Sequence, residues 1–145
     1  MGAAGFEYVR SFEMRDGGGR AEYHLIFGTH DKEGLKQMKA SMWKTDPSGG
    51  FVFSDATNFG QPTLFQLEPD YAQLERMLEK QFLNRSVAVE DIEDFVVCDT
   101  PFRESHYKGI LKAREARGAL EVVSAGVKRR RGQFPDGTVV KLLRR

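Results

Sequence analysis

The chain has 145 residues, 40% of them hydrophobic and 30% charged, which is typical of a folded domain and excludes a disordered or fibrous protein. No apolar run approaches the roughly 18 residues of a membrane-spanning helix, and we expect neither a secretion signal nor a membrane anchor. One cysteine, Cys98, excludes an internal disulfide and a multi-cysteine zinc site. We therefore expect a cytoplasmic protein.

The charges are unevenly distributed, although the net charge is only +1. Residues 100–145 contain 12 Lys and Arg against 4 Asp and Glu, a balance of +8. Residues 1–99 contain 10 against 17, a balance of −7. A basic segment in a nearly neutral chain indicates that this segment binds a polyanion.

The first predicted element is a β-hairpin. Apolar residues alternate imperfectly over residues 6–14, and residues 21–29 form a run rich in β-favouring side chains. Between them, Asp16-Gly17-Gly18-Gly19 is a turn signal, so the two runs are predicted to pair as antiparallel strands.

A helix is predicted next. Leu35, Met38 and Met42 recur at helical spacing, and Thr29 or Asp31 can cap the start of this helix. An Asp-Pro-Ser-Gly-Gly segment stops it. Both predicted elements belong to the acidic part of the chain.

Two short apolar runs separate this helix from the next. Residues 51–53 are predicted to form a short buried strand, and residues 63–67 are a second apolar run. Pro69 lies near the start of another helix, whose apolar stripe extends from Tyr71 to Leu83.

The basic third of the chain predicts two helices followed by a β-hairpin. The first helix covers residues 89–97, and the second covers residues 102–116, with Gly118 as its left-handed cap. Residues 120–124 and 138–143 are predicted strands, joined by a loop with a basic tip. The expected fold is therefore α+β, with an N-terminal β-hairpin plus helix packed against a C-terminal winged helix-turn-helix.

We expect two parts, residues 1–68 and residues 69–145. The first part is a hairpin and helix lobe, which could be the tail of an α/β domain or an extension of the winged helix. The second part is the winged helix-turn-helix.

A helix pair followed by a basic hairpin is how a winged helix-turn-helix binds nucleic acid. Its second helix enters the major groove, where Lys and Arg read guanine edges, and its wing lies along phosphates or in the minor groove. The helix at 89–97 would position the second helix without touching bases. The candidate nucleic-acid-binding residues are Arg103, Ser105, His106, Lys108 and Lys112 in the helix, and Lys128, Arg129, Arg130 and Arg131 in the wing.

No enzyme motif is present in the sequence. There is no Gly-x-Ser-x-Gly elbow and no Gly-rich phosphate loop before a Lys-Ser or Lys-Thr pair. His24, His30 and His106 do not have the spacing of metal ligands. We therefore expect no catalytic residue, no metal and no cofactor.

Six strings, in one order along nearly the whole chain, resemble the C-terminal part of the three-Cys-motif partner proteins. They are Tyr23-His24-Leu25-Ile26-Phe27-Gly28-Thr29, Gly34-Leu35-x-x-Met38-Lys39, Met42-Trp43-Lys44, Gly50-Phe51-x-Phe53-Ser54-Asp55, Thr100-Pro101-Phe102-Arg103-Glu104-Ser105-His106-Tyr107-Lys108 and Arg131-Gly132-x-Phe134-Pro135-Asp136-Gly137-Thr138.

The resemblance implies a winged helix-turn-helix that follows a larger methyltransferase-like domain. It also implies a DNA-binding or nucleic-acid-docking role in bacterial mobile elements or phage defence. The implied partner is a three-cysteine-motif protein related to radical S-adenosylmethionine enzymes. This sequence shows no methyltransferase-like domain, so we carry over none of its catalytic activity.

The sequence supports three hypotheses of different classes. In the first, the chain binds double-stranded DNA and catalyses no reaction. In the second, it is a protein-docking module that packs against a partner enzyme or a methyltransferase-like domain through an exposed apolar patch of Trp43, Phe59 or Phe65. The third is RNA binding, for which the basic third offers few aromatic side chains that could stack on bases.

Overall fold

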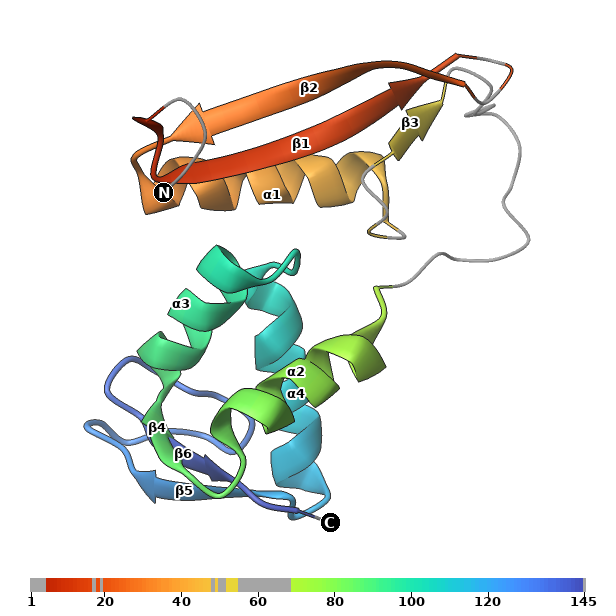
Figure 1. The fold of residues 1–145 in the computed structure, drawn as a ribbon. Coiled ribbons are helices and arrows are strands. Elements are labelled where there is room, and N and C mark those ends of the chain that lie inside the picture. The colour runs from red at the N-terminus through yellow and green to blue at the C-terminus, as the bar shows by residue number, and fades with distance from the viewer. Residues whose placement is uncertain are drawn as a thin grey trace. The chain divides into compact units, whose positions relative to one another are not determined.

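The computed structural model describes residues 5–16, 18, 20–47, 49, 52–54 and 69–144. These residues belong to two compact units, Met1–Asp70 and Tyr71–Arg145, which we describe separately (Figure 1). The apolar run at 63–67 lies outside the described residues, as do Phe51, Phe59 and Phe65. Within the described part of the chain, no helix has the length and apolar character needed to cross a membrane.

The N-terminal unit contains a mixed three-stranded sheet in the order β2-β1-β3. β1 (Tyr8–Arg15) and β2 (Ala21–Thr29) pair as the predicted antiparallel hairpin, with Phe12 opposite Leu25. β3 (Val52–Ser54) pairs parallel to β1. The expected strand at this point is therefore present, one residue later than predicted. Helix α1 (Lys32–Thr45) runs alongside β1 and β2 (Figure 1).

Two aspartates fix the turn and the helix start in this unit. Asp16 Oδ1 accepts hydrogen bonds from the backbone N–H groups of Gly18 and Arg20, both at 2.9 Å, and so closes the hairpin turn. Asp31 Oδ1 accepts from the backbone N–H of Glu33 at 3.0 Å. Of the two caps that the sequence allows, Asp31 is thus the one that satisfies a donor in the first turn of α1.

Trp43 is part of the N-terminal core, which also includes Phe12, Leu35 and Met42. A Cβ atom on Gly49 would lie 2.4 Å from the Trp43 ring, and Gly49 has a φ of +76°. Only glycine fits both restrictions. Because Trp43 is only 6% exposed, the prediction that it belongs to an exposed apolar patch is wrong, whereas Phe59 and Phe65 lie outside the described residues.

The C-terminal unit has the element order of a winged helix. Its elements are α2 (Tyr71–Phe82), β4 (Ser86–Ala88), α3 (Val89–Asp99), α4 (Glu104–Ala116), β5 (Leu120–Ser124) and β6 (Val139–Leu142). The strands form an antiparallel sheet in the order β4-β6-β5, and Figure 1 shows the three helices gathered on one side of it. The predicted helices and the two C-terminal strands are confirmed.

Strand β4 was not predicted. It has three residues, too few for a visible alternation, and only Val87 is large and apolar. Val87 lies opposite Val140, which is fully buried in β6. The strand therefore forms because a partner is available far along the chain, and a local pattern does not reveal that partner.

The break between α3 and α4 comes from Thr100. Its hydroxyl donates to the carbonyl of Val96 at 2.6 Å and accepts from the backbone N–H of Phe102 at 3.1 Å. Phe102 is only 2% exposed, so it anchors the turn in the core instead of starting the helix. For this reason α4 begins two residues later than predicted, at Glu104.

Candidate nucleic-acid interface

Helix α4 has one buried face and one open face. Tyr107, Ile110, Leu111 and Arg114 are buried at helical spacing. The opposite face is exposed and carries Ser105, Lys108, Gly109, Lys112 and Ala116. Small residues therefore flank the two lysines, so another surface can approach the helix backbone closely.

The buried face also includes the charged side chain of Arg114, whose burial the sequence does not predict. Arg114 is only 1% exposed, and its Nη1 atom lies 2.5 Å from Glu75 Oε1 and 2.7 Å from Glu79 Oε1. Its Nη2 atom donates to the carbonyl of Leu143 at 2.7 Å. Arg114 therefore ties α4 to α2 and to the residue that follows β6, and it is not available to a ligand.

Tyr107 links the two helices of the helix-turn-helix. Its hydroxyl donates to Glu93 Oε2 at 3.0 Å, and Lys108 Nζ lies 3.9 Å from the same oxygen. Burial raises the pKa of Tyr107 far above its usual value, and the nearby Glu93 carboxylate raises it further. The tyrosine therefore stays protonated as a donor, and α3 and α4 are held together by this bond.

His106 does not face the solvent. It is 8% exposed, and its ring meets Tyr71 and Phe102 edge-on, with centroids 5.7 Å and 6.0 Å away. His106 Nδ1 accepts from the backbone N–H of Arg103 at 3.3 Å, at the start of α4. His106 is therefore buried in the core, whereas the sequence predicts that it faces the DNA groove.

Arg103 and Ser105 lie at the N-terminal end of α4. Arg103 is half-buried at the N-cap position. Ser105 is exposed and lines a hollow between α2 and α4 together with Tyr71 and Arg117. Both residues thus lie at the start of α4, and neither lines the two hollows that residues of the loop between β5 and β6 border.

The loop between β5 and β6, residues 125–138, is the wing. Arg129 belongs to this loop, but its side chain does not extend into solvent. Its Nη2 atom forms an ion pair with Glu115 Oε1, and its Nη1 atom donates to the carbonyl of Gln133 at 3.0 Å. The guanidinium carbon lies 5.3 Å from the centre of the Phe134 ring. The side chain is 15% exposed. Arg129 therefore holds the wing on α4.

Two glycines in the wing donate their backbone N–H groups to carboxylates on the helices. Gly132 N donates to Glu115 Oε2 at 2.6 Å, and Gly137 N donates to Glu90 Oε1. Both glycines have positive φ, 79° and 82°, which side-chain-bearing residues rarely adopt. The two carboxylates lie 17 and 47 positions before their glycines in the sequence. The glycines are therefore the only local sign of these contacts in the sequence.

The remaining predicted cations are open to solvent. Lys108, Lys112, Lys128 and Arg130 are exposed, and among the described residues Lys112, Lys128 and Arg130 form no ion pair within 4.0 Å. Arg131 is also exposed, and its Nη2 atom donates to the carbonyl of Glu115 at 3.2 Å, at the C-terminal end of α4.

Four of these five cations border two adjoining hollows. Lys108 and Lys128 line one hollow, Lys112 and Arg131 line the other, and Gly132 lines both. The open face of α4 and the wing thus form one basic surface.

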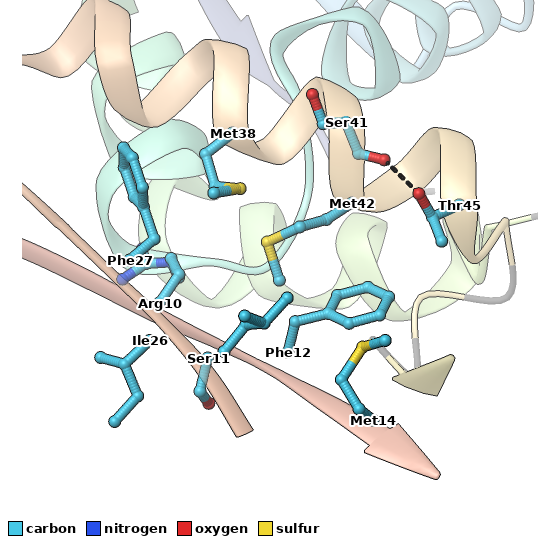
Figure 2. Close-up of a pocket in the computed structure, with 11 residues that line it drawn as sticks. Arg10, Ser11, Phe12, Met14, Ile26, Phe27, Met38, Ser41, Met42 and Thr45 are labelled. Atoms are coloured by element: carbon cyan, nitrogen blue, oxygen red, sulfur yellow. Dashed lines mark hydrogen bonds between the residues drawn. The ribbon is translucent and has the colours of Figure 1, made fainter. Parts of the chain in front are cut away.

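The N-terminal unit has an apolar hollow of about 360 Å³. Figure 2 shows that α1 contributes Met38 and Met42 to its walls and that β1 contributes Phe12 and Met14. Leu25 and Ile26 of β2 also line it, and they are 55% and 73% exposed. The flexible thioether side chains of the methionines in its walls can adapt to an apolar ligand.

A model of a protein family described as the GMT-like wHTH domain matches residues 52–126, which is 75 of the 145 residues. The match includes β3, all three helices of the C-terminal unit and β5. Neither the curated proteins nor the solved structures contain a significant match.

Proposed function

Because the chain belongs to the family of GMT-like winged helix-turn-helix domains, we propose that it binds double-stranded DNA through α4 and the wing. The observation that carries this proposal is the joint basic surface of Lys108, Lys112, Lys128 and Arg130. A DNA duplex presents phosphates on both sides of each groove, so cations from a helix and from a loop beside it can contact the same site.

In this proposal α4 enters the major groove. Lys108 and Lys112 reach base edges or flanking phosphates, and Ser105 donates near the helix start. Gly109 carries no side chain, and outside its own stretch of helix backbone no described atom lies within 4 Å of where a Cβ would be, so the helix can approach the bases closely on this side.

The wing supplies backbone contacts. Lys128 and Arg130 extend from it into solvent, and Arg131 adds charge at its base. Arg103 at the start of α4 contacts a neighbouring phosphate. His106 and Arg129 contribute by holding α4 and the wing in place, since both are occupied by contacts within the protein. We propose no catalytic step for any of these residues.

Fluorescence anisotropy of a labelled duplex, titrated at several salt concentrations, tests this proposal. We expect a steep salt dependence, and each phosphate contact removed by Lys112→Ala or Arg130→Ala should reduce the slope by about 0.9. Lys80→Ala on the exposed surface of α2 removes the same charge elsewhere and should leave the slope nearly unchanged. Equal binding of duplex DNA by all four proteins would contradict the proposed surface.

The same titration with single-stranded DNA and with duplex RNA separates the nucleic-acid classes. The width of a major groove in B-form DNA fits an α-helix, whereas the deep, narrow major groove of RNA does not. We therefore expect the duplex DNA to bind most tightly. A preference for RNA would move the function to the RNA-binding class.

A second candidate function rests on the apolar hollow of the N-terminal unit. The exposed Leu25 and Ile26 at its edge support a docking role for a partner protein, which the resemblance described above suggests is a three-cysteine-motif protein. Such a contact is largely apolar, so it should persist in high salt. Ile26→Asp should abolish capture of that partner while leaving DNA affinity unchanged, and retained capture would remove this site from consideration.

A further inference from the structure

Arg129 belongs to the basic run of residues 128–131, which the sequence predicts to contact DNA. In the described part of the structure, however, the polar contacts of Arg129 are with other residues of this protein. Its guanidinium contacts both carboxylate oxygens of Glu115, with Nη1 3.4 Å from Oε2. It also donates to the carbonyls of Arg130 and Gln133. A phosphate would have to compete with a two-pronged ion pair whose side chains are 15% and 10% exposed.

Glu115 is the second half of this arrangement. The same carboxylate accepts the Gly132 N–H at 2.6 Å, so it joins the side chain and the backbone of the wing. Within the wing, the Gln133 N–H donates to the carbonyl of Arg130 at 3.1 Å and closes the turn that contains Gly132. One carboxylate of α4 therefore fixes the position of this turn.

The turn lies directly beside a cation of the helix. A Cβ on Gly132 would be only 3.1 Å from Lys112 Cγ, so the stem of Lys112 passes over the glycine. Arg130, two residues earlier, is exposed. The contacts of Glu115 thus set the spacing between Lys112 on α4 and Arg130 on the wing.

We infer that Glu115 and Arg129 are positioning residues for DNA binding, which fix the wing against α4 so that Lys112 and Arg130 meet the duplex together. This inference rests on the proposed function. It makes an unusual prediction, because removing an acidic group from a DNA-binding surface ordinarily increases affinity by electrostatics. Glu115→Ala should instead weaken duplex binding by about tenfold, since the released wing must be ordered again on binding.

Charge-preserving variants provide the main test. Arg129→Lys keeps the charge but lacks the planar fork, so it should weaken duplex binding nearly as much as Arg129→Ala does. Arg85→Lys, at an exposed arginine outside the proposed DNA surface, is the matched control and should bind like the wild type. The double variant of Glu115→Ala and Arg129→Ala should bind no more weakly than either single variant, because both remove one arrangement.

The opposite results would overturn the inference. If Arg129→Lys binds like the wild type, or if Glu115→Ala binds more tightly, Arg129 contacts the phosphates directly. Glu121→Ala, an exposed acidic residue on β5, controls for the general effect of losing a negative charge.

An amide exchange measurement without DNA separates this inference from the proposed function. The Gly132 N–H should exchange slowly in the wild type and in Arg85→Lys, and faster in Arg129→Lys and in Glu115→Ala. If the wild type bound no DNA but showed this pattern, the proposed function would fail and the positioning contact would stand. Equal exchange in all four proteins would remove the contact itself.

Discussion

At the scale of single residues, the cations of the basic third divide by what surrounds them. Arg114 and Arg129 are held by carboxylates inside the protein, whereas Lys112 and Arg130 are open. The sequence shows a basic residue in all four places and does not separate the two groups. Helical periodicity predicts that Lys112 lies on the exposed face of α4, and the structure agrees. The carboxylate partners of the two arginines lie 14 to 39 positions away in the sequence and are not visible in a local pattern.

Arg114 provides a prediction about stability. Arg114→Ala leaves Glu75 and Glu79 without their buried partner and should lower the free energy of unfolding by about 3 kcal/mol. Arg117→Ala removes a half-exposed ion pair with the same Glu75 and should cost less than about 1 kcal/mol. Urea denaturation of both variants measures this difference, and similar losses would contradict a core role for Arg114.

Glu115 provides a prediction about pH. The hydrogen bond from Arg129 lowers the pKa of Glu115 below its ordinary value of 4.5, and the Gly132 N–H lowers it too, although burial acts in the opposite direction. Because the folded pKa is the lower one, this stabilisation is complete above pH 4.5 and is lost as the pH falls through the folded pKa.

An NMR titration of the Gly132 amide should therefore show a transition below pH 4.5 that is absent in Glu115→Gln. A Gly132 amide that responds only near the ordinary glutamate pKa, or in the same way in both proteins, would contradict the contact.

At the scale of elements, the sequence predicts the helices and strands whose pattern lies within their own residues. The hairpin, α1, α2 and the two helices of the helix-turn-helix follow from periodicity and turn residues. Strand β4 and the docking of the wing could not be predicted, because both depend on partners brought close by the fold. His106 was misplaced because its polarity suggested exposure while its position in α4 faces the core.

Gly118 shows how a local signal determines an element boundary. It has a φ of +72°, its N–H donates to the carbonyl of Glu115, and the Ala119 N–H donates to the carbonyl of Arg114 at 2.8 Å. These two bonds form a Schellman motif, which satisfies the last carbonyls of α4. The predicted cap is confirmed, and it places Glu115 in the last turn, beneath the wing.

Gly118→Ala should therefore destabilise the protein by about 1 kcal/mol, because alanine is strained at positive φ. The same change at Gly109, which lies in the middle of α4 with open space around it, should be neutral or stabilising. Thermal denaturation compares the two variants. A loss of stability at Gly109 that equalled the loss at Gly118 would argue against the motif.

At the scale of the whole molecule, charge separates the two units. Residues 1–70 contain 7 Lys and Arg against 10 Asp and Glu, and residues 71–145 contain 15 against 11. The unit that has the helix-turn-helix and the wing is thus the basic one. The expected mixture of helices and strands is confirmed, and the family match is consistent with a winged helix-turn-helix.

We expect residues 69–145 alone to fold and to bind duplex DNA at least as tightly as the full chain, since the part removed has a net negative charge. Circular dichroism and anisotropy of this fragment measure both properties. A folded fragment with much weaker binding would mean that the N-terminal unit supplies part of the DNA surface.

The most direct test of the central claim is an NMR titration of the isotope-labelled protein with a DNA duplex. We predict that the largest shift changes fall on the open face of α4, at Ser105, Lys108, Gly109 and Lys112, and on the wing at Lys128 and Arg130. Changes confined to the apolar hollow of the N-terminal unit, or no change at low salt, would contradict a DNA-binding surface formed by α4 and the wing.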